Sequence, residues 1–242
     1  MKFGASSDIG LVRSINQDSY YIPVNTALPL FMVADGMGGH NAGEIASVMA
    51  IDKIREWMAE NSTDLTNVRT IKKSIVKSVE YANRHIYNHA KEIEGCKGMG
   101  TTLTMLYVFD DKIVVGHVGD SRAYLITSNE ISQMTQDHSL VQQLLVEGKI
   151  SKREAKSHPQ KNVITRAVGT SSDIEVDVLT LDIKKDDIVI LCSDGLTNMV
   201  AEEELKDLFI DETDIQKACE KAIEGAKLKG GSDNITVLGI RF

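Results

Sequence analysis

Aspartates stand beside strand-like runs of apolar residues at several well-separated places in this chain. Asp35, Asp120 and Asp194 each follow such a run, whereas Asp18 and Asp233 each precede one. A doubly wound parallel sheet gathers its ligands at the carboxyl ends of its strands alone, so these five carboxylates share one rim only if neighbouring strands run antiparallel. The pattern therefore predicts antiparallel sheets with a cluster of carboxylates at one end.

The remaining secondary structure is predicted from hydrophobic periodicity. The predicted strands cover residues 2–6, 18–24, 30–34, 101–109, 112–118, 121–127, 175–181, 187–192 and 235–242. The predicted helices cover residues 41–60, 66–94, 201–209 and 214–227. Asp110 and Asp111 predict a tight turn between two strands. Strands interleaved with helix pairs indicate an α+β fold, with antiparallel sheets packed face to face and the helices outside.

Length and charge limit the kinds of protein that this chain can be. At 242 residues, 42% of them hydrophobic, the chain can build a sizeable core. It contains no convincing linker, so we expect a single domain over residues 1–242. The net charge of −8 disfavours binding to nucleic acid or to an anionic membrane, because both depend on Lys and Arg near phosphates.

Cysteine usage and the distribution of apolar residues favour a cytoplasmic location. Cys96, Cys192 and Cys219 are widely spaced and form no CxxC motif, which argues against a disulfide framework or a thiolate zinc site. Residues 1–25 do not read as a signal peptide, and no apolar run approaches the roughly 18 residues of a membrane span.

The carboxylates favour a site for hard divalent cations. Oxygen ligands without His or Cys are typical of Mg²⁺ or Mn²⁺, and clustered carboxylates need such countercharge. The glycines that follow Asp35 and Asp194 let the backbone turn sharply and approach a ligand, although a single Asp-Gly pair is more often only a turn. Two cations about 4 Å apart support in-line displacement at phosphorus, so hydrolysis of a phosphoester is the expected reaction.

Eight segments of the chain carry distinctive motifs: residues 13–18, 35–40, 100–102, 119–122, 137–139, 158–166, 193–196 and 233–236. In this order they resemble the motifs of the metal-dependent (type 2C) protein serine/threonine phosphatases in their compact bacterial form. Together they span nearly the whole chain, and their joint occurrence is highly specific. The resemblance implies an antiparallel β-sandwich of two sheets flanked by helix pairs, with a metal site at one end of the sheets.

The resemblance also implies a role for each matching site residue. Two core cations, Mn²⁺ or Mg²⁺, would be held by the carboxylate of Asp35, which bridges them, by the carbonyl of Gly36, and by Asp194 and Asp233. Asp18 would act through metal-bound water. Asp120, with Asp194, matches a looser third-metal site.

Arg13 matches the residue that grips the substrate phosphoryl group, a role that suits a guanidinium, although the same position is compatible with an ordinary surface residue. The implied reaction is attack by a metal-bridging water or hydroxide on phosphoserine or phosphothreonine, without a phosphoenzyme. Met37 stands where eukaryotic members carry a candidate general acid, His, and Met cannot donate a proton. His40 is an alternative acid, since it could titrate near neutral pH, or it caps a helix or holds a metal-bound water.

Residues 144–170 resemble the flap subdomain that helps such phosphatases choose substrates, and otherwise read as a solvated connection. The flap residues expected to contribute are His158, Asn162 and Arg166. By resemblance, the partners are phosphoserine and phosphothreonine proteins, with a cognate Ser/Thr kinase and its targets, and the protein is a monomer.

The sequence is also compatible with two other classes of function. A catalytically inactive phosphoprotein-binding module need not retain Asp35, Asp194 and Asp233 together, as this chain does. A hydrolase of nucleotides or other small phosphoesters would retain all three, and is the stronger alternative.

Overall fold

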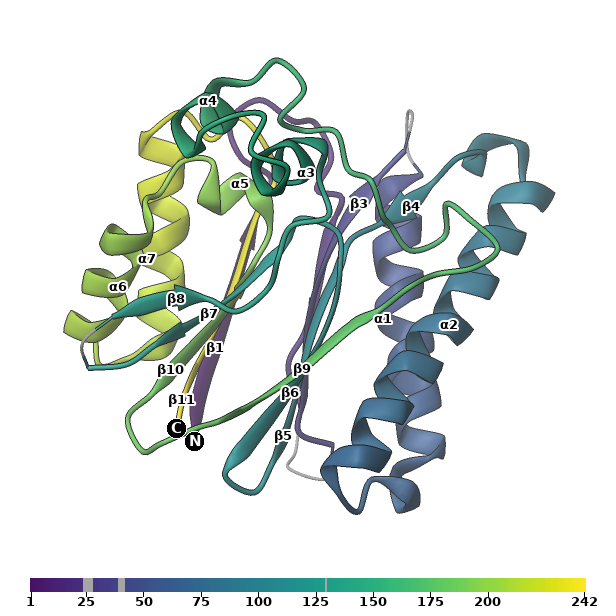
Figure 1. Ribbon diagram of the computed structural model, residues 1–242, viewed down its shortest axis with the longest axis horizontal. Helices are drawn as coiled ribbons and strands as arrows, with labels where there is room; N and C mark the ends of the chain where they lie inside the picture. Colours follow the sequence, from purple (N-terminus) through teal and green to yellow (C-terminus); the bar gives the residue numbers. More distant parts are fainter. Residues whose placement is uncertain (24–27, 39–41, 129) are drawn as a thin grey trace.

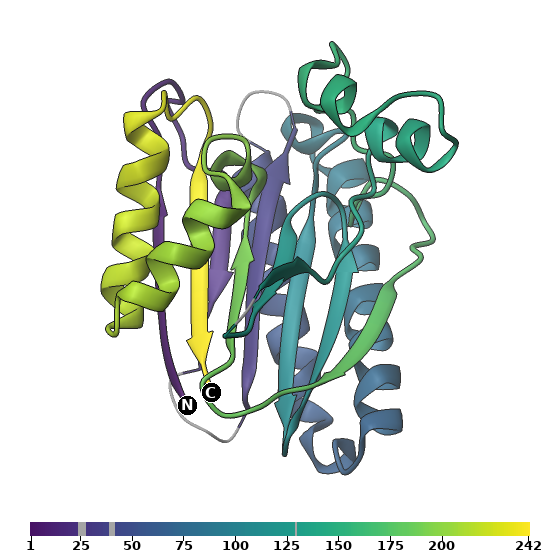
Figure 2. The same ribbon diagram turned by 60° about the vertical axis from the view of Figure 1, so that its left-hand side comes forward.

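The described residues of the computed structural model, 1–23, 28–38, 42–128 and 130–242, form two sheets packed face to face (Figures 1 and 2). Sheet A has the strand order β1 (Lys2–Asp8), β11 (Ile235–Arg241), β10 (Ile188–Cys192), β7 (Arg122–Ile126) and β8 (Ile131–Gln133). Sheet B has the order β2 (Asp18–Tyr21), β3 (Leu30–Met37), β5 (Leu103–Phe109), β6 (Lys112–Val118) and β9 (Asp177–Asp182), and β4 (Gly100–Thr101) pairs with β3. All of these pairs are antiparallel, which confirms the predicted architecture.

A helix pair covers the outer face of each sheet (Figure 1). Helices α1 (Gly43–Glu60) and α2 (Val68–Glu92) lie on sheet B, whereas α6 (Glu202–Asp211) and α7 (Ile215–Leu228) lie on sheet A. Asn67 caps α2 by accepting a hydrogen bond from the Thr70 N–H, and an apolar stripe from Ile71 to Ala90 is buried along this helix. No helix among the described ranges is both long and apolar enough to cross a membrane.

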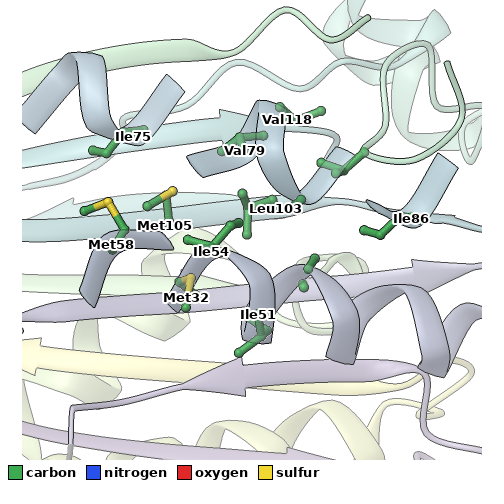
Figure 3. Packing of buried hydrophobic residues seen from close by; sticks show 14 of the residues in the cluster. Met32, Ile51, Ile54, Met58, Ile75, Val79, Ile86, Leu103, Met105 and Val118 are labelled. Carbon is green, nitrogen blue, oxygen red and sulfur yellow. The ribbon is translucent and has the colours of Figure 1, made fainter. Parts of the chain in front are cut away.

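The central strands are apolar on both faces because each face meets a different layer of the core. In β3, Phe31 and Val33 point between the two sheets, whereas Met32 and Ala34 pack beneath α1 and α2. Figure 3 shows Met32 in this outer layer with Ile54 and Met105. Sheet A repeats the arrangement over α6 and α7. This double burial fixes the strand register and thereby the positions of the residues at the strand ends.

The structure corrects three details of the predicted elements. β3 continues to Met37, so Asp35 lies inside the strand, opposite Asp18, and does not follow it. The Asp-Gly pair suggested a turn, but Gly36 instead pairs with Thr101 of β4. β8 and the short helix α5 (Asp194–Thr197) were not predicted, because runs of three and four residues are too short to show periodicity.

Two short helices, α3 (Leu140–Val146) and α4 (Lys152–Ser157), stand at the same end of the sheets as α5 (Figure 1). Two backbone hydrogen bonds join the start and the end of this segment: the Leu140 N–H donates to the Val163 carbonyl, and the Thr165 N–H donates to the His138 carbonyl. This excursion overlaps the predicted flap. The tight turn predicted at Asp110 is confirmed, since this residue has a φ of 53° and joins β5 to β6.

Candidate active site

Both sheets contribute carboxylates to the end of the sandwich near α5. Asp18 and Asp35 are direct partners on the adjacent strands β2 and β3. Asp120 lies in the connection from β6 to β7, Asp194 begins α5 after β10, and Asp233 comes just before β11. The charges of the other four residues each act on Asp35, so the five aspartates that the sequence singled out do form one cluster.

Burial and mutual repulsion make these carboxylates hard to ionise. Burial raises the pKa of Asp35 well above its usual value, and the charge of Asp18 is the next largest cause. Burial likewise raises the pKa of Asp18 to about 7 and that of Asp120 to about 7, with the charge of Asp194 adding to both. The pKa of Asp194 is raised by burial and by Asp233. Asp35 nevertheless keeps partial contact with solvent, so an ion can reach it.

The oxygens of the cluster fit hard cations. Asp18 Oδ2 accepts a hydrogen bond from Ser193 Oγ at 2.7 Å, but Asp18 Oδ1 and Asp120 Oδ1 are buried without a hydrogen-bond partner within the described part of the chain. A buried oxygen without a hydrogen-bond partner lowers the stability of the fold. Carboxylate oxygens of this kind are suitable ligands for a hard divalent cation.

The described side chains do not already form a closed ion cage. Within the residues placed by the structure, no group of three or more His, Cys, Asp or Glu side chains surrounds one point. Asp233, one of the five aspartates, is paired with Arg13 instead.

Arg13 places a cation at the rim of the cluster. Its Nη2 lies 2.7 Å from Asp233 Oδ2, and both side chains are partly exposed. The hydrogen bond to Asp233 raises the pKa of Arg13, and the charges of Asp35 and Asp194 raise it further, so the guanidinium stays charged. The family resemblance implied that Arg13 binds phosphate and that Asp233 binds a metal ion. In the structure these two side chains form an ion pair.

The backbone around Asp35 is fixed by the predicted motif at residues 100–102. The Asp35 N–H donates to Thr102 Oγ1 at 2.9 Å, while the Asp35 carbonyl accepts from the Thr102 N–H at 2.8 Å and from Thr101 Oγ1 at 2.9 Å. Gly36 is equally confined, because a Cβ there would lie 2.0 Å from the Gly43 carbonyl oxygen. These threonines were recognised only as part of a motif, and the structure supplies their role.

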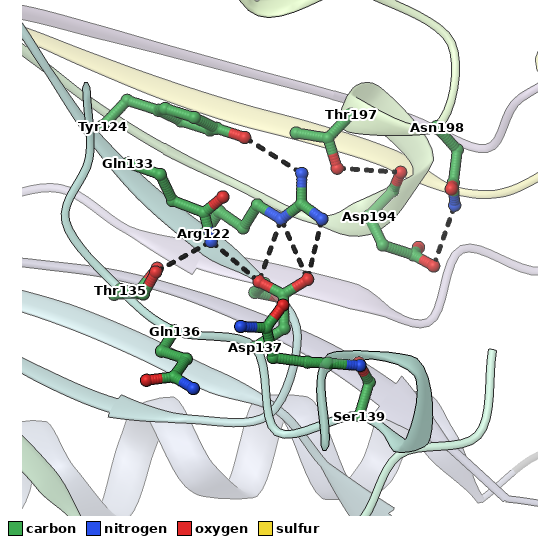
Figure 4. Close-up of polar contacts among 12 residues, drawn as sticks. Arg122, Tyr124, Gln133, Thr135, Gln136, Asp137, Ser139, Asp194, Thr197 and Asn198 are labelled. Carbon is green, nitrogen blue, oxygen red and sulfur yellow. Dashed lines mark hydrogen bonds and ion pairs between the residues drawn. The ribbon is translucent and has the colours of Figure 1, made fainter. Parts of the chain in front are cut away.

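Asp194 is held by its own short helix. Asn198 Nδ2 donates to Asp194 Oδ2 at 3.0 Å, as Figure 4 shows. Only glycine fits at position 195, because a Cβ there would lie 2.0 Å from the Asn234 carbonyl oxygen. The close packing of α5 on the start of β11 therefore brings Asp194 and Asp233 together.

A partly buried ion pair between Arg122 and Asp137 was not predicted from the sequence (Figure 4). Arg122 makes three hydrogen bonds to Asp137, at 2.9, 3.1 and 2.7 Å, and a fourth to Tyr124 Oη at 3.1 Å. The positive charge of Arg122 partly opposes the rise in pKa at Asp120 and Asp194. Both partners lay in motifs, but no feature of the sequence indicated that the two motifs meet.

The predicted flap residues lie in different settings. Arg166 pairs with Asp177 at 2.6 Å and with Glu175 at 3.3 Å. The His158 ring accepts a hydrogen bond from the Gln160 N–H, and Asn162 is exposed. Met37 ends β3, opposite Gly100 of β4. His40 lies outside the described residues.

Comparisons with known proteins agree with this arrangement. Residues 12–229 match the model of the protein phosphatase 2C family. The serine/threonine phosphatase stp of Listeria welshimeri serovar 6b is 40% identical over 233 residues, which cover 96% of this chain and 92% of that protein.

Solved structures show the same fold. The crystal structure of serine/threonine phosphatase Stp1 from Staphylococcus aureus has a TM-score of 0.93 and 33% identity, covering 100% of this chain and 95% of that one. The catalytic domain of the serine/threonine protein phosphatase PstP, in complex with two manganese ions, has a TM-score of 0.86 and 33% identity, covering 98% of this chain and 96% of that one. The chain therefore belongs to the protein phosphatase 2C family and is a serine/threonine protein phosphatase.

Proposed function

We propose that this phosphatase holds two divalent cations, Mn²⁺ or Mg²⁺, at the carboxylate cluster and hydrolyses phosphoserine and phosphothreonine by direct attack of water. Asp35 would serve both cations, the Gly36 carbonyl one of them, and Asp194 and Asp233 the other. Asp18 would act through water, and Asp120 with Asp194 would form a looser third site. The unpartnered buried oxygens of Asp18 and Asp120 carry this proposal, and the manganese ions of PstP support it.

Once bound, the cations would offset the carboxylate charge, lower the pKa of a water molecule and neutralise charge developing at phosphorus. The protein contributes rigid placement. The Asp35 backbone is fixed from both sides by Thr101 and Thr102, while Asn198 orients the Asp194 carboxylate. Preorganised groups of this kind favour catalysis because little rearrangement is needed during the reaction.

Arg13 would bind the substrate phosphoryl group. Its ion pair with Asp233 joins two partly exposed side chains, with 51% and 31% of their surfaces accessible. Such a pair contributes roughly 0–1 kcal/mol, so exchanging the carboxylate for a phosphoryl dianion costs little. The guanidinium then offers two parallel N–H donors to the phosphoryl oxygens.

Protonation of the departing alkoxide falls to a residue other than Met37. His40 is our candidate, because histidine titrates near neutral pH. The pH–rate profile of His40→Ala tests this assignment: a general acid must be protonated, so we expect loss of the limb on which the rate falls as the pH rises, and an unchanged profile on the alkaline side would rule His40 out.

The proposed setting is a single catalytic domain over residues 1–242, with a flap at residues 144–170 that selects substrates through His158, Asn162 and Arg166. The substrates would be phosphoproteins modified by a cognate Ser/Thr kinase in the cytoplasm, and the enzyme would act as a monomer. The serine/threonine phosphatase relatives support phosphoproteins as the substrates. The net charge of −8 disfavours nucleic acid as a partner.

The substrate class is tested by comparing kcat/KM for a phosphothreonine peptide, a nucleoside monophosphate and p-nitrophenyl phosphate in Mn²⁺. We expect the peptide to be preferred over the nucleotide by roughly tenfold or more, as flap contacts to a peptide are worth at least about 1.4 kcal/mol. A preference for the nucleotide would instead identify a small-molecule phosphoesterase.

A further inference from the structure

The loop that carries Arg13, residues 9–17, connects β1 to β2 and has an exposed tip. Leu11, Val12 and Ile15 all leave large apolar side chains in contact with solvent. Among the described residues, Arg13 is the only member of the segment 11–15 whose side chain makes a hydrogen bond or ion pair. The position of the guanidinium therefore depends on how the base of the loop is held.

Asn234 holds that base with a single side-chain amide. Its Nδ2 donates to the carbonyls of Ile9 and Ile15, each at 2.9 Å, and its Oδ1 accepts from the Gln17 N–H, also at 2.9 Å. The side chain thus uses both of its donor hydrogens and its acceptor within one loop. Asn234 is only 5% exposed, so water does not compete well for these bonds.

The neighbouring backbone packs tightly against the same loop. The Leu11 N–H donates to the Gly231 carbonyl at 2.7 Å. Gly10 has a φ of +80°, and a Cβ there would lie 2.2 Å from the Asp233 carbonyl oxygen. Adjacent residues therefore perform two tasks: Asn234 fixes the base of the loop, and Asp233 pairs with the guanidinium at its tip.

We propose that Asn234 is a positioning residue for phosphate binding: its amide closes the 9–17 loop so that Arg13 meets the substrate phosphoryl group. The proposal rests on the role of Arg13 proposed above. Asn is the residue type that this task requires, because Asp would turn oxygens toward two carbonyls, while Ala or Ser leaves most of the loop bonds unmade. The motif at residues 233–236 thereby gains a function beyond its carboxylate.

Steady-state hydrolysis of a phosphothreonine peptide in Mn²⁺ tests the proposal, using wild type, Asn234→Ala, Arg13→Ala and the double variant. We expect Asn234→Ala to raise KM by about tenfold while kcat changes by less than about threefold, with a parallel weakening of inhibition by inorganic phosphate. If Asn234 acts through Arg13, the same substitution in the Arg13→Ala background changes KM by less than about twofold.

Hydrogen–deuterium exchange of the metal-free protein provides a readout independent of activity. Asn234→Ala should speed exchange in residues 9–17. Asn83 is a matched control because its amide is also buried. Its Oδ1 accepts a hydrogen bond from the Gly169 N–H, and its Nδ2 donates to the carbonyls of Ser171 and Ser172. Asn83→Ala should speed exchange near residues 169–172 instead, and its effect on KM should be the same with or without Arg13.

Equal losses from Asn234→Ala in the two Arg13 backgrounds would overturn the proposal, as would unchanged exchange in residues 9–17. If Asn234→Ala does not fold, Asn234→Ser takes its place in both measurements with the same expected pattern. An unchanged KM in the single variant Arg13→Ala would show that the phosphate role of Arg13 is wrong. That outcome is separate from the hold of Asn234 on the loop, which the exchange data report directly.

Discussion

Asp35 combines a backbone fixed by hydrogen bonds with a side-chain carboxylate whose surroundings disfavour its ionised form. Thr101 and Thr102 hold its N–H and carbonyl. Burial and four neighbouring aspartates raise the pKa of the side chain. Such a carboxylate weakens the fold of the metal-free protein, so its presence is explained by the ions that we propose it to bind.

Removing that charge should therefore stabilise the metal-free protein. We expect Asp35→Asn to raise the free energy of unfolding by about 1–2 kcal/mol at pH 7.5 in EDTA, since one unfavourable ionisation disappears. Thermal unfolding measures this, and the shift is about 2–8 °C for a chain of this size.

Asp182→Asn is the matched control for this comparison. Asp182 is an exposed carboxylate that pairs with Lys112 away from the cluster. Its replacement should change the free energy of unfolding by less than about 0.5 kcal/mol. A lower unfolding temperature for Asp35→Asn than for wild type would contradict the repulsion described for the cluster.

At the scale of elements, the junction of β3 with α1 leaves no room for a side chain. A Cβ on Gly36 would meet the Gly43 carbonyl at 2.0 Å and the Gln17 carbonyl at 2.7 Å. We expect Gly36→Ala to destabilise the protein by about 3 kcal/mol or more, because backbone must move in a close-packed region.

Gly225 provides the opposite case within α7. A Cβ there meets nothing within 4 Å, so Gly225→Ala should stabilise by about 0.5–1 kcal/mol through helix propensity. Urea denaturation of the two variants measures both effects. Similar stabilities would show that the β3–α1 junction is looser than the structure indicates.

The flap should matter more for protein substrates than for small ones. Arg166 pairs with Asp177 at the point where the flap returns to sheet B. We expect Arg166→Ala to lower kcat/KM for a phosphopeptide at least about fivefold more than for p-nitrophenyl phosphate, since only the peptide reaches the flap. Equal losses on both substrates would argue against a flap role.

Long, strongly patterned elements were predictable from the sequence, whereas short elements and contacts between motifs were not. The stripe in α2 and the two-faced burial of β10 dominate their segments, so both appear within a few residues of their predicted places. Asp35 was placed after its strand because Asp-Gly is a common turn signal. The structure shows it inside β3, where pairing with β4 overrides that local preference.

The candidate site was predictable as a set of residues but not as a network. Five aspartates from separate motifs lie close enough for the charges of the other four to act on Asp35, as the antiparallel topology predicted. The contacts of Asn234 with the Arg13 loop, and of Arg122 with Asp137, link residues far apart in the chain. Periodicity and local motifs carry no information on such pairings, which arise from the packing of whole elements.

For the whole molecule, the raised carboxylate pKa values link stability to pH and to cations. A folded-state pKa above the unfolded value, as for Asp18 and Asp120 at about 7, contributes stability that is present at low pH and lost as the pH rises through that value. The metal-free protein should therefore lose stability from about pH 4, near the ordinary pKa of Asp, to about pH 8, just above the raised values.

Mn²⁺ should abolish most of this loss, because bound cations favour the ionised carboxylates and binding releases protons. Differential scanning calorimetry across this pH range, with EDTA or with Mn²⁺, measures the effect. We expect the unfolding temperature to differ by at least about 5 °C at pH 8 and by much less at pH 5. A constant difference across the range would mean that cation binding is not coupled to the cluster.

The central claim is that phosphate release depends on cations held at Asp35. Its most direct test is Mn²⁺-dependent hydrolysis of a phosphothreonine peptide by wild type and by Asp35→Asn, with EDTA-treated wild type alongside. We predict activity for wild type in Mn²⁺, with losses of roughly a thousandfold or more in the other two samples, as expected when an essential catalytic component is removed. Full activity of Asp35→Asn, or of the EDTA-treated wild type, would contradict the account.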